Sequence, residues 1–197
     1  MVSVKPEKSD SIEIEADKVS IDVTKDDDKA KVKKIVLAGS VDDVTISKAI
    51  NSIIKLNEEE STERIELYLA THGGGIDMGI GLFDIIKLSP IPVDTIVTGC
   101  SMSMGMTLLQ AGVKRYATAN SRLMIHPASG GAGRGRIQEG LLSMKDSKKL
   151  ERRNNRLVAQ RIGMKVDEYI KFMGDAKYMS PQTALKYNFI DDIRKTW

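Results

Sequence analysis

The sequence predicts an α/β protein built around a mostly parallel sheet. Short apolar segments typical of buried strands alternate with segments whose apolar residues recur at helical spacing. A strand, helix, strand, helix, strand order requires right-handed crossovers, and such crossovers join parallel strands. With 197 residues and 41% hydrophobic residues, the chain is long enough for one well-filled core.

The predicted strands are short and apolar, and most have no polar face, as expected for strands buried on both sides of a parallel sheet. They cover residues 34–37, 66–70, 93–98, 115–117 and 123–125.

The predicted helices are identified by apolar spacing and by their start signals. They cover residues 44–56, 76–88, 106–111 and 137–162, and a short one runs from Ser180 to about Asn188. Ser180 followed by Pro181 is an N-cap with proline at the first helical position. The stretch 137–162 is long and highly charged, so we expect it to protrude from the sheet.

The N-terminal residues 1–33 differ from the rest because they are rich in Lys, Asp, Glu and Ser. Alternating patterns at 11–15 and 19–23 predict two short strands, followed by a charged linker at 25–34. We therefore divide the chain into a charged N-terminal segment, 1–33, and one domain, 34–197.

Composition excludes several classes of function. Thirty basic and 27 acidic residues leave a net charge of +3, which does not indicate a nucleic-acid partner. The single cysteine, Cys100, excludes an internal disulfide and a Cys-rich zinc site and suits a reducing compartment, so we expect a cytoplasmic protein. The sequence has no run of eighteen apolar residues, and we expect neither a signal peptide nor membrane contact.

The most informative segment, 99–105, reads GCSMSMG and lies between a predicted strand and a predicted helix. A serine at such a turn can attack a substrate while helix N-terminal amides stabilise an oxyanion, which favours Ser103 as a nucleophile. A serine that only caps the helix is an equally good interpretation of this segment alone. Ser101 is a rival, although a G-x-S-x-G pattern is absent around it. Cys100 fits a small packed side chain better than a nucleophile.

A second segment, THGGGI at 71–76, also lies between a strand and a helix. Its three glycines allow a substrate backbone to approach, and amides at the helix start can face a negative charge. The segment is therefore a candidate oxyanion hole, with a purely structural turn as the alternative. It matches neither of the common glycine-rich phosphate motifs.

The chain has only two histidines, so there are few candidates for a general base near neutral pH. His126 follows a predicted strand, where open α/β sheets place their sites. His72, beside the three glycines, is its rival.

Taken together, these segments resemble the proteolytic subunit of the Clp protease family. Residues 122–127 resemble its histidine segment, 99–105 its nucleophile segment, 35–43 its opening strand, and 178–184 with 190–191 its closing helix and strand. The similarity spans about residues 34–193 in the order of the family, which makes this chain a divergent ClpP-like member.

The resemblance implies a crotonase/ClpP-like α/β fold of repeated β-β-α units, with a protruding handle helix in a handle region at about 134–162. It implies a serine endopeptidase that hydrolyses unfolded polypeptides or peptides inside a ring chamber. Ser103 would attack, His126 would relay the proton, and the Gly74 and Met104 amides would form the oxyanion hole, with no cofactor and no metal. The subunits would form a heptameric ring, stacked as a tetradecamer.

The resemblance also implies where stacked rings would pair. Arg134 or Arg136 would lie at this contact.

Three departures from the family pattern concern the site and the partners. His72 replaces the usual proline of the glycine segment, and Phe172 or Met173 stands where the third triad carboxylate is expected. Asp175 is the nearest carboxylate and is our candidate. The N-terminal segment replaces the family's axial loop, which argues against docking to an AAA+ unfoldase and favours a self-acting relative.

Two other functions remain open. A catalytically inert ring subunit would use the same assembly contacts, but it predicts loss of the serine or histidine. An acyl-CoA enzyme of the crotonase superfamily would share the fold, but it would place Asp or Glu near the thioester.

Overall fold

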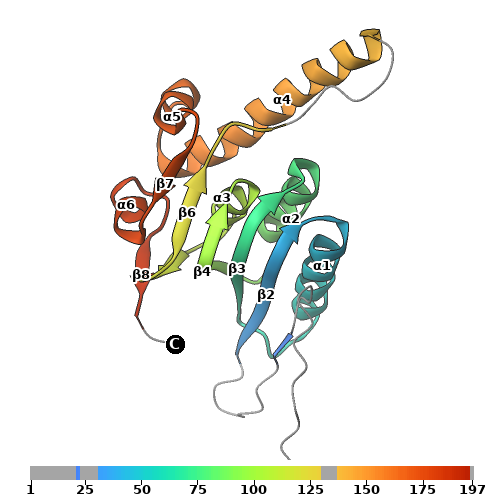
Figure 1. The fold of residues 1–197 in the computed structure, drawn as a ribbon. Helices are drawn as coiled ribbons and strands as arrows, with labels where there is room; N and C mark the ends of the chain where they lie inside the picture. Colours follow the sequence, from blue (N-terminus) through green and yellow to red (C-terminus); the bar gives the residue numbers. More distant parts are fainter. Residues whose placement is uncertain (1–20, 23–30, 130–136, 196–197) are drawn as a thin grey trace, which may run out of the picture.

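The computed structural model describes residues 21–22, 31–129 and 137–195. Within these residues the strands form one sheet in the order β1-β2-β3-β4-β5-β8, with β6 bridging β4 and β7 (Figure 1). The strands are β1 Ile21–Asp22, β2 Val32–Val41, β3 Arg64–Gly74, β4 Val93–Met102, β5 Arg115–Thr118, β6 Arg122–Ile125, β7 Lys177–Met179 and β8 Asp192–Arg194. The helices are α1 Asp43–Asn57, α2 Ile76–Leu88, α3 Met104–Leu109, α4 Ile137–Ile162, α5 Val166–Met173 and α6 Pro181–Lys186.

The sheet is mostly parallel, which confirms the predicted fold class. Among the described strands, only the pairs β1–β2 and β6–β7 are antiparallel. Strands β3 and β4 are buried along most of their length, as expected for the interior of a covered parallel sheet.

Strand β4 pairs with two strands along the same edge. Its first half pairs with β5, and its last residues, Cys100 to Met102, pair in parallel with β6. The carboxyl ends of β4 and β6 therefore lie side by side, at the edge of the sheet that faces α4 (Figure 1).

The predicted bounds of α2 and α4 agree with the structure, and α1 extends one residue beyond its prediction at each end. Asp42 caps α1, because its side chain accepts the amides of Val44 and Thr45. Ser180 caps α6 with Pro181 in the first turn, as its sequence predicts.

The structure corrects other bounds. Helix α3 begins at Met104, two residues before the predicted start, because the turn at Ser103 leads directly into the helix. Strand β2 begins at Val32, so the predicted charged linker at 25–34 overlaps the strand. Of the two predicted N-terminal strands, residues 21–22 form β1 on the edge of β2, whereas 11–15 lies outside the described residues.

Helix α4 is anchored at one end only. Val158, Ala159 and Ile162 in its C-terminal half are buried in the core, whereas Leu141 and Leu142 near its start are exposed. The N-terminal half projects away from the sheet, as expected for the handle helix (Figure 1). Arg134 and Arg136 lie outside the described residues.

Candidate active site

Ser103 occupies a sharp turn between β4 and α3. Its backbone has φ 52° and ψ −120°, a region that non-glycine residues rarely adopt. Its amide donates to the Met124 carbonyl of β6 at 2.9 Å, which fixes the turn against the neighbouring strand. The side chain stands at the N-cap position of α3 but makes no capping hydrogen bond. The hydroxyl is therefore not used to cap the helix, and the strained turn is typical of a nucleophile.

The two rivals of Ser103 lie in other environments. Ser101 is fully buried in β4, and its Oγ has no hydrogen-bond partner among the described residues. Cys100 is partly exposed and contacts His72. Neither residue lines the cavity beside Ser103.

His126 follows β6 in the same way that Ser103 follows β4. Because Met102 is in register with Met124, the residues that follow these two strands are neighbours. Both Ser103 and His126 are half-buried and line one small cavity of about 30 Å³. His72 lies outside this cavity, so the geometry separates the two histidines and joins only His126 to the serine.

The glycine segment lies against the serine turn. A Cβ on Gly73, which has φ 97°, would lie 2.7 Å from the Ser103 Cβ and 3.0 Å from the Met104 nitrogen. A Cβ on Gly74 would instead lie 2.4 Å from the Val41 carbonyl oxygen. Both positions therefore require glycine, and the missing side chain at Gly73 keeps the Met104 amide accessible. The Met104 amide belongs to the first turn of α3, where amides have no acceptor within the helix.

The comparison with known protein families identifies the family of this chain. A family model described as Clp protease matches residues 17–196 of the chain. The chain belongs to the Clp protease family. The resemblance inferred from the ordered motifs is thereby confirmed, and membership implies a serine peptidase in general.

A Clp protease is expected to carry a carboxylate near residue 172, and here the structure shows an aromatic cluster. The ring centroid of Phe172 lies 4.6 Å from that of Tyr187 and 6.2 Å from that of Phe189. Met173 is buried in the core. Asp175 is exposed just after the end of α5 and makes no hydrogen bond to His126 among the described interactions.

Helices α4 and α5 contribute further residues to the cavity that Ser103 and His126 line, and the sequence analysis did not predict these residues. Glu151, Asn154 and Asn155 line it at helical spacing, together with Tyr169 of α5. The Asn154 Oδ1 is buried without a partner among the described residues, and burial raises the pKa of Tyr169. The adjacent uncharged pair Asn154-Asn155 within a charged helix was the available sequence signal.

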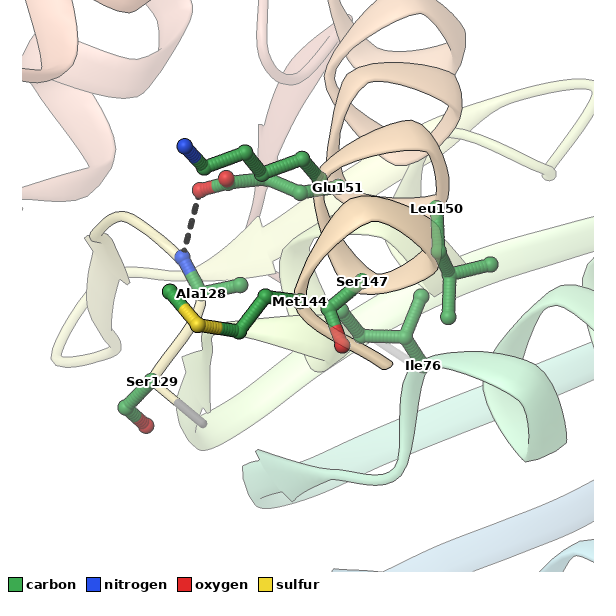
Figure 2. A pocket seen from close by; sticks show the side chains of 8 residues that line it. Ile76, Ala128, Ser129, Met144, Ser147, Leu150 and Glu151 are labelled. Atoms are coloured by element: carbon green, nitrogen blue, oxygen red, sulfur yellow. Dashed lines mark hydrogen bonds between the residues drawn. The ribbon is translucent and has the colours of Figure 1, made fainter. Parts of the chain in front are cut away.

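A wider cleft of about 340 Å³ adjoins the cavity and shares Ile76, Ala128 and Glu151 with it. The Glu151 carboxylate accepts the Ala128 amide at 2.8 Å, which ties the segment after His126 to α4 (Figure 2). Met144 and Leu150 of α4 line the same cleft, so the protruding helix forms one of its walls (Figure 2).

The described residues contain no group of three or more His, Cys, Asp or Glu side chains arranged to hold a metal ion. Nor does any described helix combine the length and the apolar character that crossing a membrane requires.

Proposed function

We propose that this Clp protease family member is a serine endopeptidase in which Ser103 is the nucleophile and His126 the general base. The observation that carries the proposal is the shared cavity: an uncapped serine in a strained turn and a histidine on the neighbouring strand end line the same small space. A nucleophile and a base held together by parallel strand ends are the arrangement that acyl transfer requires.

The reaction follows from these positions. Ser103 Oγ attacks the peptide carbonyl carbon while His126 accepts its proton, and the carbonyl oxygen becomes an oxyanion. His126 then donates the proton to the leaving amine, which leaves an acyl-enzyme. Water, activated by the same histidine, attacks the acyl group and releases the second product.

The amides of Met104 and Gly74 are the proposed oxyanion donors. Support for Met104 comes from its place in the first turn of α3, directly after the nucleophile. Gly73 donates its amide to the Thr71 Oγ1, and Gly75 donates to the Val41 carbonyl, so these two amides are engaged. We propose Gly74 as the second donor because the family resemblance implies it and because the amides of its two neighbours are already engaged.

Asp175 is the proposed third member of the triad. Its support is the pairing of β6 with β7, in which Ile125 is opposite Lys177. Continued beyond that pair, the antiparallel register brings Asp175 to the end of β6 that carries His126. A carboxylate there would orient the imidazole and stabilise its protonated form.

Unfolded polypeptides or peptides are the proposed substrates, bound in the cleft beside α4. The cleft has a volume of about 340 Å³ and adjoins the cavity, with which it shares three lining residues. We further propose a cytoplasmic enzyme assembled as heptameric rings, because Clp proteases generally form rings and α4 protrudes as a ring-stacking helix would.

One observation favours a second candidate, a catalytically weak or inert ring subunit. Phe172 lies in an aromatic cluster where the family pattern expects a carboxylate. Such a subunit would assemble normally without reacting.

A fluorophosphonate probe followed by peptide mapping tests the proposal, with native mass spectrometry to establish assembly. We expect labelling of Ser103 in the wild type, loss of labelling in Ser103→Ala, and strongly reduced labelling in His126→Ala. Ser101→Ala is the matched control and should label normally, since Ser101 is buried outside the cavity. An assembled but unlabelled wild-type ring would favour the inert subunit.

The role of Asp175 has its own test. Asp175→Ala should lower kcat by about 10²-fold or more, because an unoriented histidine is a poor base. Asp167 is the control, since its carboxylate is exposed and its nearest charged partner among the described residues is Arg152, at 3.8 Å. Equal turnover of a fluorogenic peptide by the Asp175→Ala and Asp167→Ala variants would remove Asp175 from the site.

A further inference from the structure

The cavity beside Ser103 and His126 has polar side chains from three helices in its wall. Thr107 of α3, Asn154 of α4 and Tyr169 of α5 all line it. Each of these side chains can form hydrogen bonds, and none of them carries a charge at neutral pH. The space next to the nucleophile therefore presents neutral hydrogen-bonding groups in addition to its apolar residues.

These three polar groups find no hydrogen-bond partner among the described residues. Thr107 is 1% exposed and Tyr169 is 3% exposed, and in the described part of the chain neither side chain makes a hydrogen bond. The Asn154 Oδ1 is buried and likewise lacks a partner there. Burial raises the pKa of Tyr169, so its hydroxyl stays protonated and can donate. Because buried polar groups are nearly always hydrogen-bonded, three such groups around one space indicate that it receives a polar group.

The size of the cavity limits what it can receive. Its volume is about 30 Å³. A group of the size of a water molecule needs about 10–15 Å³, so the cavity holds about two such groups. The side chains of serine and threonine match this size and carry a hydroxyl group, whereas a long or aromatic side chain does not fit.

The substrate side chain nearest to the cavity is that of the residue whose carbonyl group Ser103 attacks. The Cβ of this residue is two bonds from the attacked carbon, whereas the Cβ of the residue on the leaving side is three bonds away. The attacked residue also stays bonded to Ser103 in the acyl-enzyme. Because Ser103 itself lines the cavity, the side chain on the acyl side is the one that enters it.

We propose that the cavity selects serine or threonine on the acyl side of the scissile bond, with Asn154 and Tyr169 as specificity-determining residues. The Asn154 carboxamide accepts the hydrogen bond of the substrate hydroxyl, and the Tyr169 hydroxyl donates to its oxygen. The carboxamide can turn toward the substrate, because the terminal torsion of asparagine has broad minima. An apolar side chain of the same size would leave both groups unpaired. This inference rests on the proposed peptidase function, since it names the substrate class of the same site.

Fluorogenic peptides that differ only in the acyl residue test the selection on the full-length protein. Threonine and valine have nearly the same shape, so the ratio of their kcat/KM values isolates the contribution of the hydroxyl group. We expect the wild type to prefer threonine by at least about tenfold, and to cleave the serine peptide faster than the phenylalanine peptide. A threonine-to-valine ratio at or below one, or a phenylalanine peptide cleaved as fast as the serine peptide, would overturn the proposal.

Two variants test whether the cavity makes the selection. Tyr169→Phe removes only the hydroxyl group, and Asn154→Leu replaces the carboxamide by an apolar group of similar size, so each should lower the threonine-to-valine ratio several-fold. Tyr187→Phe and Gln160→Leu are the matched controls and should keep the wild-type ratio, because neither residue lines the cavity. Tyr187 packs against Phe172, and Gln160 is exposed on α4. An unchanged ratio in both cavity variants, or an equal fall in the controls, would show that another part of the protein makes the selection.

Fluorophosphonate labelling separates this inference from the proposed function. The probe carries no serine or threonine side chain, so the wild type, Tyr169→Phe and Asn154→Leu should be labelled at Ser103 at similar rates. If the wild type is not labelled and cleaves no peptide, the peptidase function fails and the selection fails with it. If the wild type is labelled and cleaves peptides without preferring threonine to valine, the peptidase function stands and the selection is wrong.

Discussion

At the scale of single residues, Gly73 is the position on which the candidate site depends most directly. It combines a backbone conformation that favours glycine with close approach to three atoms of the serine turn. The nearest are the Met102 carbonyl oxygen and the Ser103 Cβ, both 2.7 Å from the place of a Cβ, and these atoms belong to the backbone or to the nucleophile itself. They cannot move aside without moving the nucleophile.

We therefore predict that Gly73→Ala lowers kcat/KM for peptide hydrolysis by about 10²-fold, because the added methyl displaces Ser103 and covers the Met104 amide. The same change strains the backbone by about 1–3 kcal/mol, so fluorophosphonate labelling should be measured at a temperature where thermal unfolding shows the variant folded. Gly81→Ala is the control: it lies in α2, and its Cβ would meet nothing within 4 Å. Wild-type activity in folded Gly73→Ala would contradict the proposed geometry.

At the scale of elements, α4 contributes both to the core and to the wall of the candidate site. Its C-terminal half is part of the core, and its middle, from Glu151 to Asn155, forms a wall of the candidate site. The Glu151 carboxylate accepts a hydrogen bond from the Ala128 amide and so positions the residues that follow His126. A charged helix that sequence analysis treats as a protrusion thus also shapes the cleft.

Glu151→Ala should lower kcat/KM about tenfold, mainly through a higher KM, because a hydrogen bond to a charged group contributes about 1.5–3 kcal/mol. Glu151→Gln should retain most activity, since its amide oxygen can still accept the Ala128 amide. Steady-state kinetics on one fluorogenic peptide compare the two. Asp146→Ala changes an exposed acid of the same helix and should have no effect. Equal losses in Glu151→Gln and Glu151→Ala would show that the charge matters, not the hydrogen bond.

The elements also show why sequence patterns predicted some features and not others. Helix α2 has clear apolar spacing, so its bounds could be predicted from local pattern. Strands β7 and β8 have three residues each and exist because they pair with β6 and β5, which no local pattern indicates. Asn154 was missed for the same reason: its contact with the Ser103 cavity depends on how α4 packs. Ser103 and His126 could be proposed because both follow predicted strands, but their proximity depends on the β4–β6 pairing.

At the scale of the whole molecule, one buried arginine ties the C-terminal part of the chain to the sheet. Arg115 of β5 is 2% exposed, and its guanidinium donates to Gln110, to Asn188 and to the Asp191 carboxylate. The shortest of these contacts is 2.6 Å, from Arg115 Nη2 to Asp191 Oδ1. Strand β8 and the Phe189-Ile190 core pair lie next to this anchor, so it supports the β5–β8 edge of the sheet.

The same anchor makes stability depend on pH. Burial alone would raise the pKa of Asp191, but the hydrogen bonds and the charge of Arg115 outweigh burial and lower the pKa below its ordinary value. A carboxyl group with a lowered pKa in the folded state stabilises the protein above its unfolded pKa, and this stabilisation is lost as the pH falls through the folded value. Acidification below about pH 4 should therefore weaken the Arg115–Asp191 pair and with it the C-terminal anchor.

We predict that Asp191→Asn lowers the free energy of unfolding by about 2 kcal/mol at pH 7, because Arg115 stays buried without its counter-charge. The difference from the wild type should shrink as the pH falls from about 4 to about 2, since the wild-type carboxyl group then becomes neutral as well. Urea unfolding at one protein concentration and several pH values measures both quantities. Asp192→Asn, an exposed neighbour whose carboxylate accepts only the Ile193 amide among the described interactions, is the control. If Asp191→Asn destabilises the protein equally at pH 7 and at about pH 2, the prediction is wrong. The effect would then come from packing or from lost hydrogen bonds, and the charge of Asp191 would have no part in the anchor.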